Sequence, residues 1–268
     1  MNRIDETFAR LKIERRAALM PYLPLGYPTL DLSLPLIRAA AAAGADMLEL
    51  GVPFSDPLAD GTVIQRATHI ALQNGTTLAK CFEIARQARQ VGVTIPLVLM
   101  GYTNPLLRFG LDASARAAKE AGVDGFIVPD LPPEEAGALD AACRGQDLDL
   151  IFLAAPTSTP GRLRLIADAT RGFLYLVSVT GVTGVRDQVA ADLAEFVRRV
   201  RAVTLKPVCV GFGIGSPESA RTVAGLADGV IVGSALVSRI GEPQTAVEAG
   251  REFISELRRA IGQAAGQD

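Results

Sequence analysis

Three carboxylates lie close together in residues 48–61, where the chain changes from an apolar run to a Gly/Pro-rich loop. Glu49 stands inside the apolar run, and Asp56 and Asp60 follow in the loop. A carboxylate in a buried strand loses hydration, and partners or a raised pKa must offset that loss. General acid–base catalysis needs this kind of arrangement. The segment therefore predicts a carboxylate acid–base site.

Each of the three acids also has a structural interpretation. Glu49 could pair with a buried arginine, but no arginine occupies a predicted strand, so a functional role is favoured. Asp60 precedes Gly61 and could equally cap a helix that begins near Thr62. Asp56 is typical of a solvated loop residue on its position alone.

Residue types that are missing narrow the chemistry further. His69 is the only histidine and falls in a predicted helix, and no cluster resembles a metal site. No lysine is placed for Schiff-base chemistry. The four lysines are Lys12, Lys80, Lys119 and Lys206. Carbon–carbon bond chemistry would then depend on carboxylates alone, which requires a leaving carbon that accepts a proton, as in an electron-rich ring such as indole.

Eight short apolar runs predict the elements that position these acids. Most are unbroken rather than alternating, as expected for parallel strands buried on both faces. The runs span 17–25, 46–50, 96–101, 125–128, 149–153, 172–177, 207–211 and 229–233. Ala-, Leu- and Arg-rich helical stretches separate them. Eight βα units in 268 residues fit a single (β/α)8 TIM barrel over 1–268 better than an open sheet or two small domains.

The predicted helices add extensions to this barrel. Residues 1–14 form an amphipathic helix ahead of the first strand, and the helix after the second strand is doubled, 62–73 and 76–90, around an Asn-Gly turn. A closing helix, 243–265, gives extra helical structure after the eighth strand, and we expect the tail 262–268 to fray.

Two glycine segments follow the seventh and eighth predicted strands. Gly213 lies in the first, and Gly233 with Ser234 opens a helix in the second. Barrels bind phosphate at this place through backbone N–H groups and a helix N-terminus. Tyr175, in the sixth strand, fits a plain core position best, and Thr183 with Gly184 fits either a mobile lid or an ordinary loop.

Composition gives no support to several classes of partner. The net charge is −2 and the 27 Lys and Arg residues are scattered, which gives no reason to expect nucleic acid or a membrane surface. No apolar run approaches the roughly 20 residues of a membrane span. Cys81, Cys143 and Cys209 form no ligand or redox motif and suit buried thiols in a reducing cytoplasm.

The fourteen residues 48–61 closely resemble the signature of the tryptophan synthase alpha chain family. The resemblance covers nearly the whole chain, and we find no departure at a catalytic position. Further matching segments are 24–28, 100–105, 129–132, 155–157, Tyr175, 178–184, 211–214 and 233–234.

The resemblance implies a reaction and residue roles. The family cleaves indole-3-glycerol phosphate to indole and glyceraldehyde 3-phosphate by a retro-aldol reaction. Glu49 then corresponds to the general acid/base, Asp60 stabilises charge on the indole nitrogen, and Tyr175 lines the site beside Glu49. The implied phosphate-binding residues are Gly184, Gly213, Gly233 and Ser234, and the implied pocket residues are Tyr22, Met100, Ile127, Thr183, Phe212 and Ile231.

The resemblance also implies a partner, a beta chain in an alpha2beta2 tetramer. Pyridoxal phosphate belongs to that beta chain, and no cofactor is expected in this one. Family members contact the partner around Pro53, Asp56, Asn104 and Pro132, which makes Asp56 a candidate signalling residue. Closure of residues 180–188 over substrate would exclude water and bring Thr183 toward Asp60.

Three other hypotheses stay open at this point. The chain could be a free-standing lyase that releases indole. It could be another phosphosugar barrel, such as an isomerase, although the doubled helix and the acidic loop argue against that. It could also be a catalytically silent regulatory subunit, although the presence of Glu49 and Asp60 argues against that.

Overall fold

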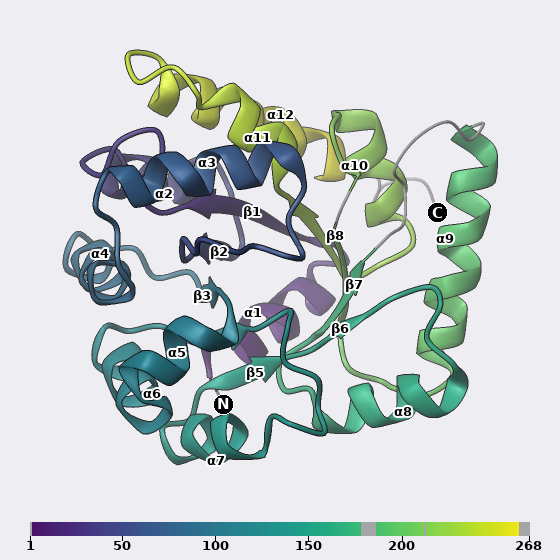
Figure 1. Ribbon diagram of the computed structural model, residues 1–268. Helices are drawn as coiled ribbons and strands as arrows, with labels where there is room; N and C mark the ends of the chain where they lie inside the picture. The colour runs from purple at the N-terminus through teal and green to yellow at the C-terminus, as the bar shows by residue number, and fades with distance from the viewer. Residues whose placement is uncertain (1, 178–185, 212, 263–268) are drawn as a thin grey trace.

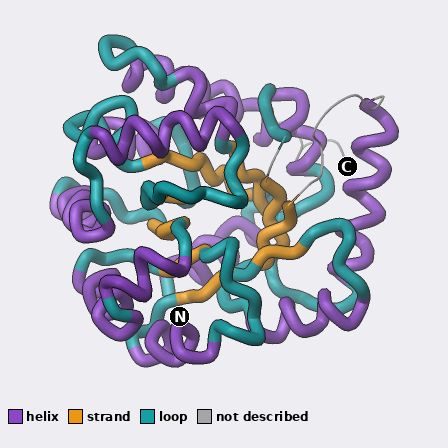
Figure 2. Tube along the Cα trace, viewed as in Figure 1, coloured by secondary structure: helices purple, strands orange, loops and turns teal. Residues whose placement is uncertain are grey.

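Parallel strands form a barrel at the centre of the molecule, and helices surround it (Figures 1 and 2). The computed structural model describes residues 2–177, 186–211 and 213–262. Within them the sheet order is β5-β4-β3-β2-β1-β9-β8-β7-β6. The strands are β1 (Ala18–Pro24), β2 (Leu48–Gly51), β3 (Leu97–Met100), β4 (Gly125–Ile127), β5 (Asp149–Ile151), β6 (Leu153–Ala154), β7 (Leu174–Val177), β8 (Val208–Gly211) and β9 (Gly229–Val232). The predicted TIM barrel is confirmed.

The fifth predicted strand is divided in two at Phe152. Its first part, β5, pairs with β4, and its second part, β6, pairs with β7. The Phe152 N–H donates to the Thr170 hydroxyl at 3.1 Å. One barrel strand therefore appears as two labelled strands, and the ring of strands closes through Phe152.

The helices follow the predicted pattern, with one addition. The N-terminal helix, the doubled helix after β2 and the two helices after β9 are all present. A second doubled helix, α5 and α6, follows β3 and was not predicted. The helices are α1 (Arg3–Ile13), α2 (Ser33–Ala42), α3 (Thr62–Gln73), α4 (Leu78–Gln90), α5 (Thr103–Phe109), α6 (Leu111–Glu120), α7 (Gly137–Gly145), α8 (Pro160–Ala169), α9 (Arg186–Arg201), α10 (Pro217–Ala224), α11 (Ser234–Arg239) and α12 (Ala246–Gly262).

Successive residues of each strand face opposite sides of the barrel wall. On β2, Leu48 and Leu50 belong to the apolar layer between strands and helices, whereas Met47, just before the strand, belongs to a separate cluster inside the barrel. Glu49 lies between the two leucines and is in register with Tyr22 on one side and Val98 on the other. Both of these neighbours belong to the inner cluster. The pleat therefore turns Glu49 into the barrel interior.

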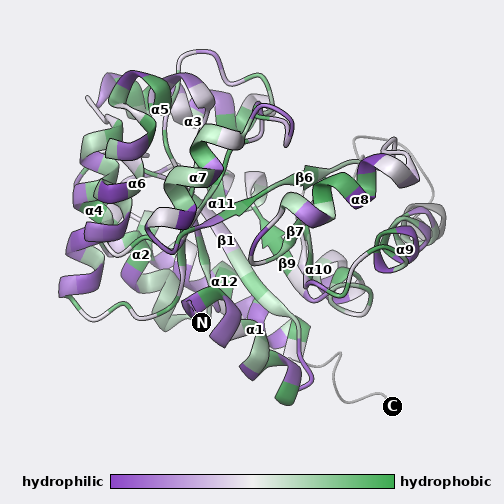
Figure 3. Ribbon diagram, turned by 90° about the horizontal axis from the view of Figure 1, so that it is seen from below, coloured by the Kyte–Doolittle hydropathy of each residue, from purple (hydrophilic) through white to green (hydrophobic). Residues whose placement is uncertain are grey.

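Helix α1 closes the N-terminal end of the barrel. Its apolar residues Ile4, Phe8 and Leu11 join the inner cluster, and the Phe8 ring lies 5.8 Å from the ring of Phe173. The view from below shows hydrophobic and hydrophilic residues on different parts of α1 (Figure 3). With this end occupied by α1, the open end of the barrel lies at the carboxyl ends of the strands.

Asp46 anchors the segment that leads into β2. Its carboxylate accepts hydrogen bonds from Arg16 at 2.7 Å, from Arg258 at 2.9 Å and from the Leu19 N–H at 3.0 Å. Arg10 donates a fourth, at 3.4 Å. These bonds tie β1, α1 and α12 to the start of the strand that carries Glu49.

We expect Asp46→Ala to lower the free energy of unfolding by about 3 kcal/mol, because it leaves partly buried guanidinium groups without their carboxylate. Chemical denaturation of the variant and the wild type measures the difference. Asp31→Ala is the matched control, since Asp31 is exposed, and should change stability by less than about 0.5 kcal/mol. An Asp46 variant as stable as the Asp31 variant would contradict the anchoring role.

Candidate active site

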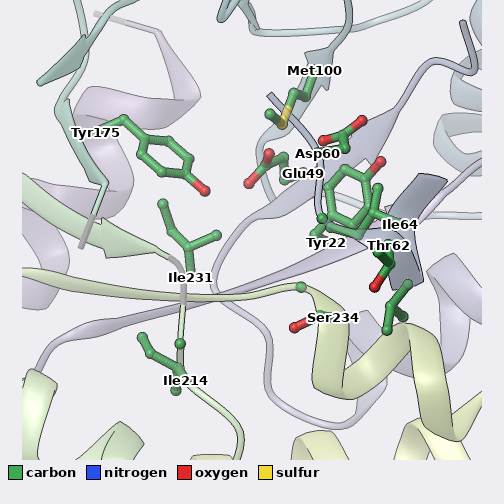
Figure 4. A pocket seen from close by; sticks show the side chains of 14 residues that line it. Tyr22, Glu49, Asp60, Thr62, Ile64, Met100, Tyr175, Ile214, Ile231 and Ser234 are labelled. Carbon is green, nitrogen blue, oxygen red and sulfur yellow. The ribbon is translucent and has the colours of Figure 1, made fainter. Parts of the chain in front are cut away.

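A pocket of about 260 Å³ opens at the carboxyl ends of the strands. Figure 4 shows Glu49 and Asp60 close together on one wall, with Ile214 and Ser234 at the opposite end. The described lining residues are Tyr22, Glu49, Asp60, Gly61, Thr62, Val63, Ile64, Met100, Tyr175, Gly213, Ile214, Ile231, Gly233 and Ser234. The pocket therefore brings together residues from strands that are far apart in the sequence.

Glu49 is held almost without solvent, with 1% of its surface exposed. Its Oε2 atom has no hydrogen-bond partner within the described part of the chain. Burial raises the pKa of Glu49 to about 8, and the negative charge of Asp60 adds to the rise. At neutral pH the group is therefore mainly a protonated acid that has a proton to donate.

Asp60 lies in the loop between β2 and α3 and is only partly exposed. The helix begins with Gly61 as its N-cap, so the Asp60 side chain does not occupy the capping position. Burial raises the pKa of Asp60 to about 6, and a hydrogen bond from the Tyr102 hydroxyl opposes the rise. Asp60 is therefore mainly ionised at neutral pH, while Glu49 is mainly neutral.

Two tyrosines flank the acids, and each lies over a glycine of a neighbouring strand. Figure 4 shows the Tyr175 hydroxyl directed toward Glu49 from the opposite wall. A Cβ atom at Gly211 would meet the Tyr175 hydroxyl, and one at Gly51 would meet the Tyr22 hydroxyl. Glycine at 51 and 211 thus leaves the space that the two tyrosine rings occupy.

The other end of the pocket offers backbone groups. Gly213 lies in the loop after β8, and Gly233 is the N-cap of α11, which begins at Ser234. None of the described lining residues is a lysine or an arginine. Peptide N–H groups and hydroxyls are therefore the groups this end offers to an anion.

The pocket does not contain every residue that was predicted to line it. Ile127 is fully buried in the inner cluster and is absent from the described lining. Thr183, Gly184 and Phe212 lie outside the described residues, as does most of the predicted loop 180–188. Sequence reasoning missed five residues of the described lining: Gly61, Thr62, Val63, Ile64 and Ile214. All five lie within four residues of a predicted site residue, so extending each motif by one helical turn would have included them.

The four predicted partner-contact residues differ in their exposure. Asp56 and Asn104 are exposed and Pro132 is half-buried. Pro53 is buried, so it supports the loop rather than presenting a surface. Leu58, in the same loop, is 88% exposed and was not singled out.

The remaining candidate groups have ordinary environments. His69 is exposed and its ring contacts Gln73, and all three cysteines are buried free thiols, as predicted. Within residues 2–177, 186–211 and 213–262, no three His, Cys, Asp or Glu side chains gather into a group suited to a metal ion. No described helix is long and apolar enough to cross a bilayer.

Comparison with protein families shows to which family the chain belongs. The family model described as tryptophan synthase alpha chain matches residues 8–265. The chain belongs to the tryptophan synthase alpha chain family. Its relatives include the tryptophan synthase alpha chains of Chloroflexus aggregans, 51% identical over 96% of this chain and 97% of the relative, and of Geobacter sulfurreducens, 50% identical over 98% and 100%.

Solved structures agree with this relationship. The alpha subunit of tryptophan synthase from Legionella pneumophila superimposes with a TM-score of 0.91 at 40% identity, covering 98% of this chain and 99% of that one. A chain of tryptophan synthase from M. tuberculosis gives 0.89 at 39% identity, covering 98% and 100%. The resemblance drawn from the sequence is confirmed: this alpha chain is a lyase of tryptophan biosynthesis. Its family implies a beta-chain partner, and pyridoxal phosphate belongs to that partner.

Proposed function

We propose that the pocket cleaves indole-3-glycerol phosphate to indole and glyceraldehyde 3-phosphate, with Glu49 as the acid/base and Asp60 as the partner of the indole nitrogen. The observation that carries this proposal is the pair of carboxyl groups that line one pocket, where burial raises the pKa of Glu49 to about 8 and that of Asp60 to about 6. Between these values one group is mainly a proton donor and the other mainly an anion, as the chemistry requires.

Glu49 alone can donate the proton that the reaction needs and then take one back. The neutral Glu49 carboxyl donates its proton to the ring carbon that bears the glycerol chain, and positive charge then develops on the indole nitrogen. The ionised Asp60 stabilises this charge in a site with little water. The carbon–carbon bond breaks as Glu49 takes the proton of the adjacent glycerol hydroxyl. The bonding electrons return to the ring, an aldehyde forms, and Glu49 is protonated again.

The two ends of the pocket suit the two ends of this substrate. The end of the pocket that holds Glu49 and Asp60 has apolar walls, which are formed by Met100, Ile231 and the rings of Tyr22 and Tyr175. Such flat apolar walls suit an indole ring. Gly213, Gly233 and Ser234 would hold the phosphate through backbone N–H groups and a hydroxyl. An anion held in this way leaves no lysine or arginine beside Glu49 to depress its raised pKa.

The proposal extends to the assembly. We propose an alpha2beta2 tetramer with a beta chain that uses the released indole, in the cytoplasm, with no nucleic-acid or membrane partner. The exposed residues Asp56, Leu58 and Asn104 would contact that chain. Three buried free thiols support a reducing compartment.

Indole release from indole-3-glycerol phosphate tests the function directly. The purified chain is assayed alone, and then with a beta chain and serine. We expect slow release alone and a strong increase with the partner. Fast release alone would instead support a free-standing lyase. Absence of release under both conditions, with activation of the beta chain retained, would support the silent regulatory subunit and overturn the proposed chemistry.

A further inference from the structure

A second cavity, of about 680 Å³, lies beside α1. Its lining comes from α1, from the ends of α9 and α10, and from the segments that lead into β1, β8 and β9. These segments precede their strands, so this α1 cavity lies at the end of the barrel opposite to the active-site pocket. Its volume lies within the range of sites that bind small organic molecules. The proposed lyase reaction does not use it.

Part of the wall of the α1 cavity is apolar. Phe8 and Leu11 of α1 are buried there, as are Ala17 and Ala227, which precede β1 and β9. Leu205 also lines the cavity, and its surface is 100% exposed. A ligand with an apolar body would cover these side chains and remove apolar surface from water on both sides.

The charged side chains of the α1 cavity are mostly basic. Arg16 and Arg201 are each paired with an aspartate, at 2.7 Å and 2.6 Å. Lys12 and Arg15 line the same cavity and are exposed. Within residues 2–177, 186–211 and 213–262, neither of these two side chains has a hydrogen-bond or ion-pair partner. The cavity therefore presents two cationic groups that are available to an anion.

Arg15 stands in a backbone conformation that favours glycine. Glu14 is the C-cap of α1, and Arg15 follows it with a φ of 51°. The Arg15 N–H donates to the Lys12 carbonyl at 3.3 Å, and the Arg16 N–H donates to the Leu11 carbonyl at 3.1 Å. This pair of bonds is the Schellman motif, in which the residue after the C-cap is usually glycine.

Other helices of this chain end in the same motif with a less strained residue. After α2, α3, α4 and α6 the position is held by Gly44, Gly75, Gly92 and Gly122. After α7 it is held by Asp147, a residue type that tolerates a positive φ. These helices have the same dipole and carry no cation at this position, so the dipole alone does not account for Arg15. Helix α1 thus forgoes the unstrained residue and places a guanidinium group at the cavity.

We propose that the α1 cavity binds a small organic anion that has an apolar body. The anionic group pairs with Lys12 and Arg15. The apolar body lies against Phe8, Leu11 and Leu205. Both parts of the ligand are needed, since an inorganic ion lacks the apolar contacts and a neutral ring lacks the ion pairs. This site is separate from the proposed lyase site and does not depend on that function.

Methyl NMR of the full chain with 2-naphthoate, a two-ring carboxylate, tests the proposal. The methyl signals of Leu11 and Leu205 should shift and saturate with a Kd of about 1 mM or below. The signal of Met100, which lines the active-site pocket, should stay in place. 2-Naphthylmethanol, which keeps the rings without the charge, and inorganic phosphate should each bind at least about tenfold more weakly. A probe that shifted Met100 and left Leu205 unmoved would overturn the proposal.

Arg15→Gly removes the cation and the backbone strain together. Glycine is unstrained at this φ, so the Tm of the variant should be no lower than that of the wild type, and weaker binding could not come from unfolding. We expect its Kd for 2-naphthoate to rise about fivefold, because one ion pair is lost. Lys12→Gln should weaken binding by a similar factor. Neither variant should change the Kd of 2-naphthylmethanol.

Asp147→Gly is the matched control. It makes the same kind of backbone change, at a φ of 52°, but Asp147 is not among the described residues that line the α1 cavity. Its Kd for 2-naphthoate should equal that of the wild type. An unchanged Kd in both Arg15→Gly and Lys12→Gln would overturn the proposal, as would equal affinity of the wild type for 2-naphthoate and 2-naphthylmethanol.

Discussion

Glu49→Gln should lower the rate of indole release by at least about a thousandfold. The substitution keeps the size and shape of the side chain but removes the proton that passes to the ring and the base that takes the hydroxyl proton. A single acid–base step contributes about 10²- to 10⁴-fold, and Glu49 serves two. Single-turnover assays with indole-3-glycerol phosphate measure the rate, and equilibrium binding measures whether the substrate still enters. Binding should stay within a few-fold of the wild type.

The same variant carries a stability signature. Because the pKa of Glu49 is raised to about 8 in the folded chain from 4.5, the wild type loses stability between these values as the unfolded chain ionises and the folded chain does not. Glu49→Gln lacks this loss, so its free energy of unfolding should rise relative to that of the wild type by about 3.5 kcal/mol between pH 5 and pH 8. Denaturation at both pH values measures it.

Glu120→Gln, on the exposed surface of α6, is the control and should match the wild type in rate and stability. A Glu49→Gln variant with near-normal turnover would remove Glu49 from the mechanism. A stability difference that did not grow with pH would mean that Glu49 is ionised in the folded chain.

Asp60→Asn should lower kcat by about 10²- to 10³-fold, as expected when one electrostatic partner of a developing charge is removed. It should also change the pH dependence of the remaining activity. The charge of Asp60 contributes to the raised pKa of Glu49, so its loss should move the alkaline limb of the profile to lower pH. The acid limb near pH 6, which Asp60 itself sets, should disappear.

Asp112→Asn serves as the control, because Asp112 is exposed on α6 and distant from the pocket lining. The acid and alkaline limbs are compared in full pH profiles of kcat/KM for the wild type, Asp60→Asn and Asp112→Asn. If Asp60→Asn kept the wild-type rate, Asp60 would have only a structural role in its loop. That role would not be to cap α3, because the N-cap residue of this helix is Gly61.

The fold was largely predictable because its strands are unbroken apolar runs separated by helical stretches. The sequence located every barrel strand to within about two residues. It did not reveal the break at Phe152, because that break arises when Thr170, eighteen residues away, takes a backbone N–H that the ladder would otherwise use. It also did not reveal the second doubled helix, since no strong turn signal such as Asn-Gly separates α5 from α6.

The candidate site was predictable where chemistry requires an unusual residue type. Glu49 stood out as a charge in an apolar strand, and the glycines stood out by their place after two strands. Tyr102 did not stand out, because its contact with the acidic loop, a hydrogen bond from the Ala59 N–H to its hydroxyl, joins residues 43 positions apart in the sequence. The prediction that Tyr175 lines the pocket came from the family resemblance, since its position in the sequence alone favoured an ordinary core residue.

The separation of the apolar residues into an inner and an outer cluster has a consequence for how this protein tolerates change. Neighbouring residues of β2 have different roles: Leu48 and Leu50 pack against helices, and Glu49 faces the pocket. A complete mutational scan should therefore alternate along the strand, with losses of abundance at the leucines and loss of turnover at full abundance at Glu49. New chemistry could be selected on the inner residues of such a barrel while its outer residues, and the stability that they supply, stayed as they are.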